Sequence, residues 1–160
     1  MFLRLIVIAA FLICSTPLKA EPLEGDYLYK VTTVRAATGK LEDLLNWVAE
    51  MKASDYFDEI GAPAPFVMRH SQGDQWDLLK IEPMGSWRAY HSKSNEKRRA
   101  KAAATYGENL AAGSAFVAFA EDHFAYGPPI EEIETAFDKN SFFHIEMFKA
   151  APGKMDELTK

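Results

Sequence analysis

A stretch of sequence near the start of the chain recurs near its end, and this internal repeat limits the possible folds more than any other feature. Residues 29–44 align without a gap to residues 143–158. The residues identical in both copies are Ala36, Ala37, Gly39, Lys40 and Leu44, which recur as Ala150, Ala151, Gly153, Lys154 and Leu158. Each copy has the pattern of a strand, a tight glycine turn and the start of an amphipathic helix. The repeat therefore predicts one strand-to-helix unit built twice, unless two such units resemble each other by chance.

The second copy has room for its strand and turn but not for a full helix. In the first copy the helix continues through an apolar stripe at 3.6-residue spacing, formed by Leu41, Leu44, Leu45, Val48 and Met51. In the second copy the sequence ends at Lys160, soon after the presumed helix start, and so short a helix is marginal in water. We therefore expect a tandem-repeat protein that is truncated in its second repeat. The alternative is that the last residues form a frayed tail.

The sequence between the two copies supplies the other elements of a small α+β domain. Two apolar runs, residues 66–70 and 76–81, are separated by a polar turn and predict a β-hairpin. Ser86 is placed to cap a short helix that begins at Trp87. The alanine-rich residues 95–112 predict a long helix.

Two further segments have less regular patterns. The aromatic residues within 116–124 suit either a helix or a short closing strand. A Gly-Pro-Pro sequence then begins a segment that we expect to be a linker. The predicted domain organisation is therefore a first ferredoxin-like α+β unit at residues 26–127, a linker at 128–140, and the start of a second, truncated unit at 141–160. The last of these begins with the first strand of the second copy.

The order strand, helix, hairpin, helix and closing element is that of a ferredoxin-like α+β unit, whose sheet carries helices on one face only. The other face must be covered by a second copy, in another chain or in the same one. On residues 37–44, 85–91 and 151–158, the sequence resembles the dimeric α+β barrel superfamily, which includes NIPSNAP-like and antibiotic-biosynthesis-monooxygenase-like proteins. The resemblance implies a homodimer, or an intramolecular pseudo-dimer if the full chain carries a second repeat.

The first 20 residues have the pattern of an export signal. Arg4 precedes ten apolar residues, 5–14, a run too short to span a bilayer core of about 30 Å. Pro17 then breaks the segment, and Ala20 is a small residue suited to a cleavage site. These features predict a signal peptide at residues 1–20 and a periplasmic or secreted protein with no membrane attachment after cleavage. The alternative is an uncleaved anchor or a buried N-terminal strand.

The chain is acidic, with 18 Lys and Arg residues against 23 Asp and Glu residues and a net charge of −5. This charge argues against nonspecific nucleic-acid binding, which depends on neutralising phosphates. The only cysteine, Cys14, lies in the predicted signal peptide. The sequence therefore predicts no disulfide, no thiol catalysis and no cysteine-bound zinc in the mature chain.

Alternation along the two equivalent strands predicts which side chains face the interior of the barrel. In the second copy His144 and Glu146 share one face, and in the first copy Lys30 and Thr32 occupy the equivalent positions. The other face of each strand is more apolar and is expected to lie under the helices. We therefore predict that a ligand contacts Lys30, His144, Glu146 and Trp76, which heads a strand of the hairpin.

His144 and Glu146 are the candidates for a general base enclosed in the barrel, although the sequence assigns no catalytic residue. The alternative for this pair is a hydrogen-bonded contact that bridges the two barrel halves.

The sequence predicts neither a metal nor a dissociable cofactor. The four histidines are scattered and match no ligand spacing such as HExxH. The sequence also lacks a P-loop, a GxGxxG motif and a GxSxG motif. In the haem-degrading branch of the superfamily, an Asn, a Trp and a His serve haem chemistry. The matching positions here hold Thr32, Tyr90 and Ala100, so the resemblance implies no haem chemistry.

Three functions are compatible with these features. The first is an exported α+β barrel protein that binds a small apolar or aromatic ligand. The second is a cofactor-independent monooxygenase or isomerase, which acts on a phenolic or quinol-like substrate with His144 or Glu146 as the base. The third is a purely structural dimerisation domain, whose interior is filled by side chains and holds no cavity of ligand size.

Overall fold

The computed structural model describes residues 25–71, 75–154 and 157 of the chain. The predicted signal peptide at residues 1–20 lies outside the described residues. Among the helices of the described part, none combines the length and the apolar character that a membrane crossing requires.

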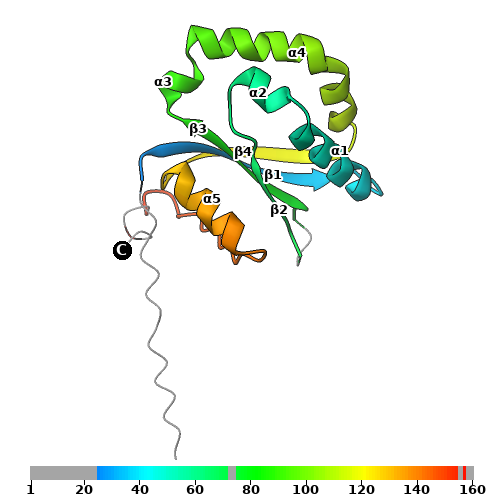
Figure 1. The fold of residues 1–160 in the computed structure, drawn as a ribbon. Helices are drawn as coiled ribbons and strands as arrows, with labels where there is room; N and C mark the ends of the chain where they lie inside the picture. Colours follow the sequence, from blue (N-terminus) through cyan, green and yellow to red (C-terminus); the bar gives the residue numbers. More distant parts are fainter. Residues whose placement is uncertain (1–24, 72–74, 155–156, 158–160) are drawn as a thin grey trace, which may run out of the picture.

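Strand β1 (Tyr27–Ala36) is the central strand of a four-stranded antiparallel sheet (Figure 1). It pairs on one side with β3 (Leu78–Gly85) and on the other with β4 (Val117–Gly127). Strand β2 (Phe66–Arg69) pairs with β3 and completes the order β2-β3-β1-β4. This arrangement confirms the predicted ferredoxin-like α+β fold.

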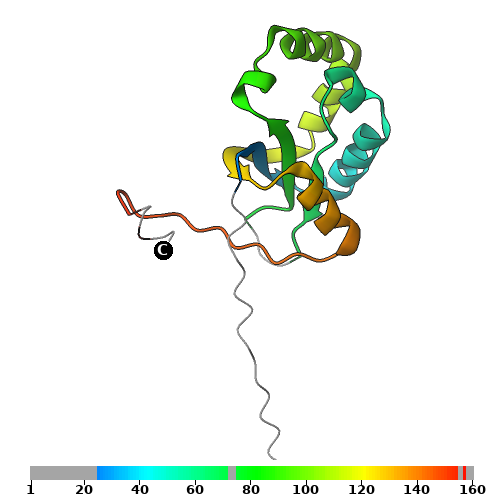
Figure 2. The ribbon, with the colours of Figure 1, turned by 60° about the vertical axis from the view of Figure 1, so that its left-hand side comes forward.

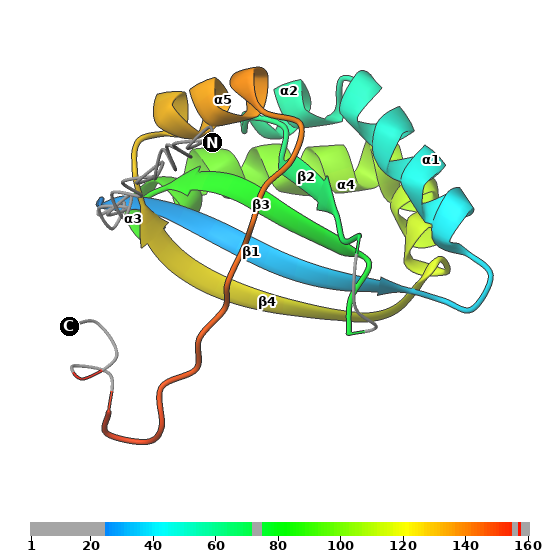
Figure 3. The same ribbon diagram turned by 90° about the horizontal axis from the view of Figure 1, so that it is seen from below.

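Four helices cover one face of this sheet (Figure 3). They are α1 (Leu41–Ala53), α2 (Tyr56–Ile60), α3 (Trp87–Tyr90) and α4 (Lys93–Ser114). The apolar stripe predicted for the first helix turns toward the sheet, because Leu44 and Met51 are buried. The predicted hairpin, short helix and long helix are all present, with ends that differ from the prediction by a few residues.

Local residues explain where three of these helices begin. Gly39 has a φ of 73°, a left-handed conformation that glycine adopts without steric cost, and it ends the turn before α1. The hydroxyl of Ser86 accepts a hydrogen bond from the backbone N–H of Ala89 at 3.2 Å at the start of α3. The hydroxyl of Ser92 accepts one from the backbone N–H of Asn95 at 3.3 Å at the start of α4. Both serines are N-caps, as the sequence predicts for the first of them.

Helices α1 and α4 are in close contact at a glycine. Gly113 is buried, and a Cβ atom at this position would lie 2.1 Å from the Trp47 ring. The indole N–H of Trp47 donates to the side-chain oxygen of Asn109 at 2.7 Å. The large ring of one helix therefore fills the space that a side chain at Gly113 would need.

The structure corrects the prediction that residues 128–140 are a linker. Most of this segment forms α5 (Ile130–Lys139), which lies along the β2 edge of the sheet (Figure 1). The Phe137 ring of α5 packs on the Phe66 ring of β2, with centroids 4.8 Å apart. Residues 130, 133 and 137 have helical spacing and are apolar, a signal that the Gly-Pro-Pro sequence before them obscured.

Residues 140–150, which we call the C-terminal segment, cross the face of the sheet that the four helices leave open (Figure 2 and Figure 3). Residues 142–150 pair with no strand within the described part of the chain, which corrects the prediction of a strand here. The equivalent strand of the first copy, β1, has hydrogen-bonded neighbours on both sides. The C-terminal segment runs across the strands rather than along an edge, so it gains no such neighbours.

The turns of the two repeat copies have the same local conformation. Gly39 and Gly153 have φ angles of 73° and 74°. The lysine after each glycine donates its backbone N–H to the alanine carbonyl three residues before it, at 2.8 Å and 2.9 Å. The tandem repeat itself stays a prediction.

The sequence allowed either a helix or a strand for residues 116–124, and the structure shows that most of them belong to strand β4. It is an edge strand, and its side chains are exposed from Ala118 to Tyr126. The exposed fractions of Phe119, Phe124 and Tyr126 are 53%, 52% and 62%. Large aromatic side chains therefore remain in contact with solvent along this edge.

Candidate functional site

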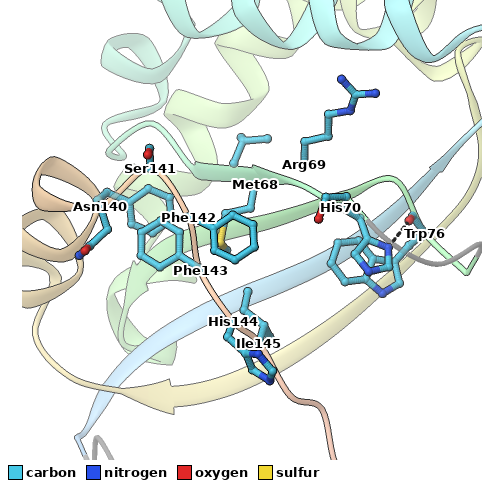
Figure 4. A pocket seen from close by; sticks show the side chains of 13 residues that line it. Met68, Arg69, His70, Trp76, Asn140, Ser141, Phe142, Phe143, His144 and Ile145 are labelled. Carbon is cyan, nitrogen blue, oxygen red and sulfur yellow. Dashed lines mark hydrogen bonds between the residues drawn. The ribbon is translucent and has the colours of Figure 1, made fainter.

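A cavity of about 490 Å³ lies between β2, Trp76 and the C-terminal segment (Figure 4). We call it the β2 cavity. One wall comes from the residues at the end of β2 and from Trp76, and the other comes from α5 and the C-terminal segment. The side chains on which the argument depends are Met68, His70, Trp76, Phe137, Phe143 and His144.

The first wall is a stacked pair of rings. The rings of His70 and Trp76 are nearly parallel, at 16°, with centroids 4.0 Å apart. Nδ1 of His70 donates to the backbone carbonyl of Trp76 at 3.0 Å. The backbone N–H of His70 also donates to the carbonyl of Asp77 at 2.7 Å, and the N–H of Asp77 donates to the carbonyl of Val34 at 2.8 Å. These bonds tie the stacked pair to the sheet and set its orientation.

The second wall is also aromatic. Phe143 stacks on Phe137 of α5, with centroids 4.6 Å apart and an interplanar angle of 29°. Phe142 lines the cavity as well, but its side chain is 78% exposed, whereas Phe143 is half-buried. Figure 4 shows the phenylalanine rings on one side of the cavity and the His70–Trp76 pair on the other, with the Met68 side chain beside the phenylalanines. The arrangement can hold a flat apolar group between aromatic surfaces.

The structure brings two of the four predicted ligand residues, Trp76 and His144, to the β2 cavity. Glu146 does not line the cavity but accepts a hydrogen bond from Nε2 of His144 at 3.0 Å. The side chains of His144 and Glu146 are 79% and 60% exposed. The pair is therefore open to solvent in this structure, and the enclosed general base that the sequence suggested is not formed here.

Lys30 and Thr32 lie on the helix-covered face of the sheet, which corrects the prediction that they face away from the helices. Residues directly opposite each other on antiparallel strands share a face, and Lys30 is opposite both Glu82 and Phe124. The Phe124 ring packs on Trp87 of α3, with centroids 4.6 Å apart. The sequence analysis assigned the more apolar face of the strand to the helices. That face is instead covered by α5 and the C-terminal segment.

Lys30 lines a second cavity of about 330 Å³ between the sheet and helices α2, α3 and α4, which we call the helix-side cleft. Nζ of Lys30 lies 2.8 Å from Oε2 of Glu82. Burial alone would lower the pKa of Lys30, but the hydrogen bond and negative charge of Glu82 outweigh it and raise that pKa. Lys30 is therefore a charged group in a partly buried site.

Within residues 25–71, 75–154 and 157, no group of three or more His, Cys, Asp or Glu side chains is placed to hold a metal ion. The β2 cavity offers aromatic walls, one thioether and imidazole groups, which suit binding and orientation of an apolar molecule.

Of the six β2-cavity residues on which the argument depends, the sequence analysis missed four, which are Met68, His70, Phe137 and Phe143. His70 stands at the end of the predicted hairpin strand, across the turn from Trp76, and this juxtaposition was a signal that could have identified it. Phe143 was assigned to the face that packs under helices, because a second sheet was expected around it.

Comparisons with known proteins support the fold. No protein-family model matches the chain, and no curated protein matches it. A solved NIPSNAP family protein from Agrobacterium tumefaciens has a TM-score of 0.51 and 14% identity, covering 64% of this chain and 87% of that protein. A NIPSNAP family protein of unknown function from the same organism has a TM-score of 0.49 and 17% identity, covering 64% of this chain and 89% of that protein.

An uncharacterised NIPSNAP domain protein from Burkholderia xenovorans gives a TM-score of 0.45 at 15% identity, covering 61% of this chain and 91% of that protein. At such identities, the likeness to the first of these structures shows the fold alone. The chain has a NIPSNAP-like α+β fold.

Proposed function

We propose that this chain is an exported protein that binds a small aromatic ligand in the β2 cavity. The observation that carries the proposal is the stacked Trp76–His70 pair, which faces Phe143 across a cavity of about 490 Å³. This volume lies in the range of small-molecule sites, which are lined mainly by apolar and aromatic side chains. Aromatic pairs in offset or edge contact add stabilisation beyond the area they bury.

The rings that line the cavity are held in place before any ligand arrives. Trp76 is anchored through the backbone bonds of His70 and Asp77, and Phe143 is anchored by stacking on Phe137. A pre-organised site loses less side-chain entropy on binding, so more of the contact energy appears as affinity. A flat, uncharged ring therefore fits the arrangement better than a flexible chain.

A titration with p-cresol, a small neutral aromatic compound, tests the proposal by calorimetry. We expect saturable binding that weakens about tenfold in Trp76→Ala and in Phe143→Ala, because each change removes one aromatic wall. Phe148→Ala is the matched control, because Phe148 is 71% exposed and does not line the cavity. This control should bind p-cresol as the unchanged chain does.

Two results would contradict this assignment. One is the absence of saturable p-cresol binding, and the other is equal affinity in the two wall variants and in the unchanged chain. Circular dichroism on each variant separates loss of the site from loss of the fold.

The proposal includes export and self-association. Export rests on the pattern of residues 1–20, and cleavage after Ala20 would be detected by N-terminal sequencing of the mature protein. Self-association as a homodimer rests on the exposed aromatic side chains of β4, which are Phe119, Phe124 and Tyr126. A second copy of the chain is the partner that we propose for this edge.

A further inference from the structure

The helix-side cleft is a second cavity, on the other face of the sheet from the β2 cavity. Its floor is formed by Lys30 of β1 and Glu82 of β3. Its walls come from three helices, with Tyr56 on α2, Tyr90 on α3 and Arg99 on α4. Its volume of about 330 Å³ is enough for a molecule of one ring.

The charged groups around the cleft carry a positive surplus, although the chain as a whole is acidic. The carboxylate of Glu82 is shared by two ammonium groups, with Nζ of Lys30 at 2.8 Å and Nζ of Lys80 at 3.0 Å. On the neighbouring strand, Asp122 accepts a hydrogen bond from the hydroxyl of Thr32 at 2.6 Å. Among the side chains that line the cleft, the two cations Lys30 and Arg99 face one carboxylate, that of Glu82.

Arg99 forms no ion pair within the described part of the chain. Its guanidinium carbon lies 4.1 Å from the centre of the Tyr90 ring, so the ring face holds the cation at the cleft wall. Lys30 and Arg99 both line the cleft, and the positive charge of each lowers the pKa of Tyr56, against the larger opposite effect of burial. A planar guanidinium and a nearby ammonium together suit a carboxylate ligand.

The remaining walls are aromatic and aliphatic. Tyr56 makes an edge contact with Phe57, with centroids 5.1 Å apart, and Ile60 follows on the same helix. Burial is the main cause of a raised pKa at Tyr56, so its phenol remains protonated and can donate a hydrogen bond at neutral pH. The cleft therefore combines a cationic end with an apolar lining.

We propose that the helix-side cleft binds a small aromatic carboxylate, with the carboxylate at Lys30 and Arg99 and the ring against Tyr56 and Ile60. The carboxylate neutralises the positive surplus, and the ring replaces water at the apolar wall. This site is separate from the β2 cavity, and its ligand is an anion rather than a neutral ring. The proposal does not depend on the function proposed above.

Calorimetric titration with benzoate tests this site in the Trp76→Ala chain, whose β2 cavity has lost one aromatic wall, with benzamide as the neutral analogue and inorganic phosphate as the anion without a ring. We expect saturable benzoate binding, benzamide binding at least about tenfold weaker, and no detectable phosphate binding. Lys30→Met and Arg99→Gln should each weaken benzoate binding about tenfold. Lys101→Gln, an exposed change on the same helix, is the matched control and should leave it unchanged.

Several outcomes would overturn the proposal. These are no benzoate binding at millimolar concentration, equal binding of benzamide, equal binding of phosphate, or full affinity in both cleft variants. If circular dichroism shows that Lys30→Met does not fold, Arg99→Gln alone decides. Because the cleft is titrated with benzoate in the Trp76→Ala chain and the β2 cavity with p-cresol in the unchanged chain, failure of one site does not hide the result at the other.

Discussion

Tyr29 connects the central strand to the segment that leads into α5. Its side chain is buried, and its hydroxyl donates to the backbone carbonyl of Pro128 at 2.7 Å. Burial, with smaller contributions from neighbouring negative charges, raises the pKa of Tyr29 to about 12. The folded chain therefore keeps this proton at pH values where the unfolded chain has lost it.

The raised pKa predicts how stability depends on alkaline pH. Between about pH 10 and pH 12 the unfolded state releases the Tyr29 proton and the folded state retains it, so the free energy of unfolding falls as pH rises. Tyr29→Phe removes this dependence. Near pH 8 we expect the variant to be less stable by about 1 kcal/mol, because it lacks the hydrogen bond to Pro128.

By about pH 12 the stability difference between the two chains should move in favour of the variant by roughly 2 kcal/mol. Urea unfolding across this range measures the difference. Tyr126→Phe in the Phe119→Glu chain, which is expected to be monomeric, is the control, because Tyr126 is 62% exposed in a single chain. A difference between Tyr29→Phe and the unchanged chain that stays constant with pH would contradict the account of Tyr29.

Individual residues were harder to place from the sequence than the strands that carry them. Alternation separated Lys30 from Tyr29 correctly, but polarity did not show which of the two faces meets the helices. The sequence could not reveal that Glu82 lies opposite Lys30, because that pairing depends on register. Trp76, which was predicted from its position at the head of a strand, lines the β2 cavity, and its role as a ligand contact stays a prediction.

Among the elements, the packing of α1 on α4 can be tested at its closest point. Gly113→Ala places a methyl group against the Trp47 ring, and overpacking of this kind costs about 1–3 kcal/mol. Gly107→Ala on the same helix has nothing within 4 Å of the added carbon. It should gain up to about 1 kcal/mol, because alanine favours the helix over glycine.

Chemical denaturation of the two glycine variants gives the comparison directly. Gly113→Ala should lower the free energy of unfolding, and Gly107→Ala should raise it or leave it unchanged. Equal stability of the two variants would mean that the helices are not in close contact at Gly113.

Helices and strands with strong local signals were predicted well, and elements that depend on distant partners were not. The serine cap and alanine-rich composition identified α3 and α4, because these signals act within a few residues. Helix α5 was missed because proline and glycine before it indicated a linker. The strand expected from residue 143 was wrong for a different reason, since a strand requires neighbours that the sequence pattern cannot supply.

At the scale of the whole molecule, the edge strand β4 leaves large aromatic side chains exposed to solvent. Phe119, Phe124 and Tyr126 are each more than half exposed, and burial of such side chains favours association. We expect a homodimer at micromolar concentration, which Phe119→Glu converts to a monomer by placing a charge in the contact. Sedimentation analysis of the chain, with the exposed helix change Lys97→Glu as control, measures this. A chain that is monomeric without any change would contradict the homodimer.

The β2 cavity is lined by residues from the middle of the chain and by residues of α5 and the C-terminal segment, so a single probe inside it tests the account most directly. The chain has three tryptophans, and Trp47→Phe with Trp87→Phe leaves Trp76 as the only tryptophan, which is excited at a wavelength where tyrosine and p-cresol hardly absorb. The measurement is the Trp76 fluorescence during a titration with p-cresol. The account predicts a saturable change that Phe143→Ala shifts to about tenfold higher concentration. A linear change without saturation, identical in both chains, would contradict binding of an aromatic ligand in this cavity.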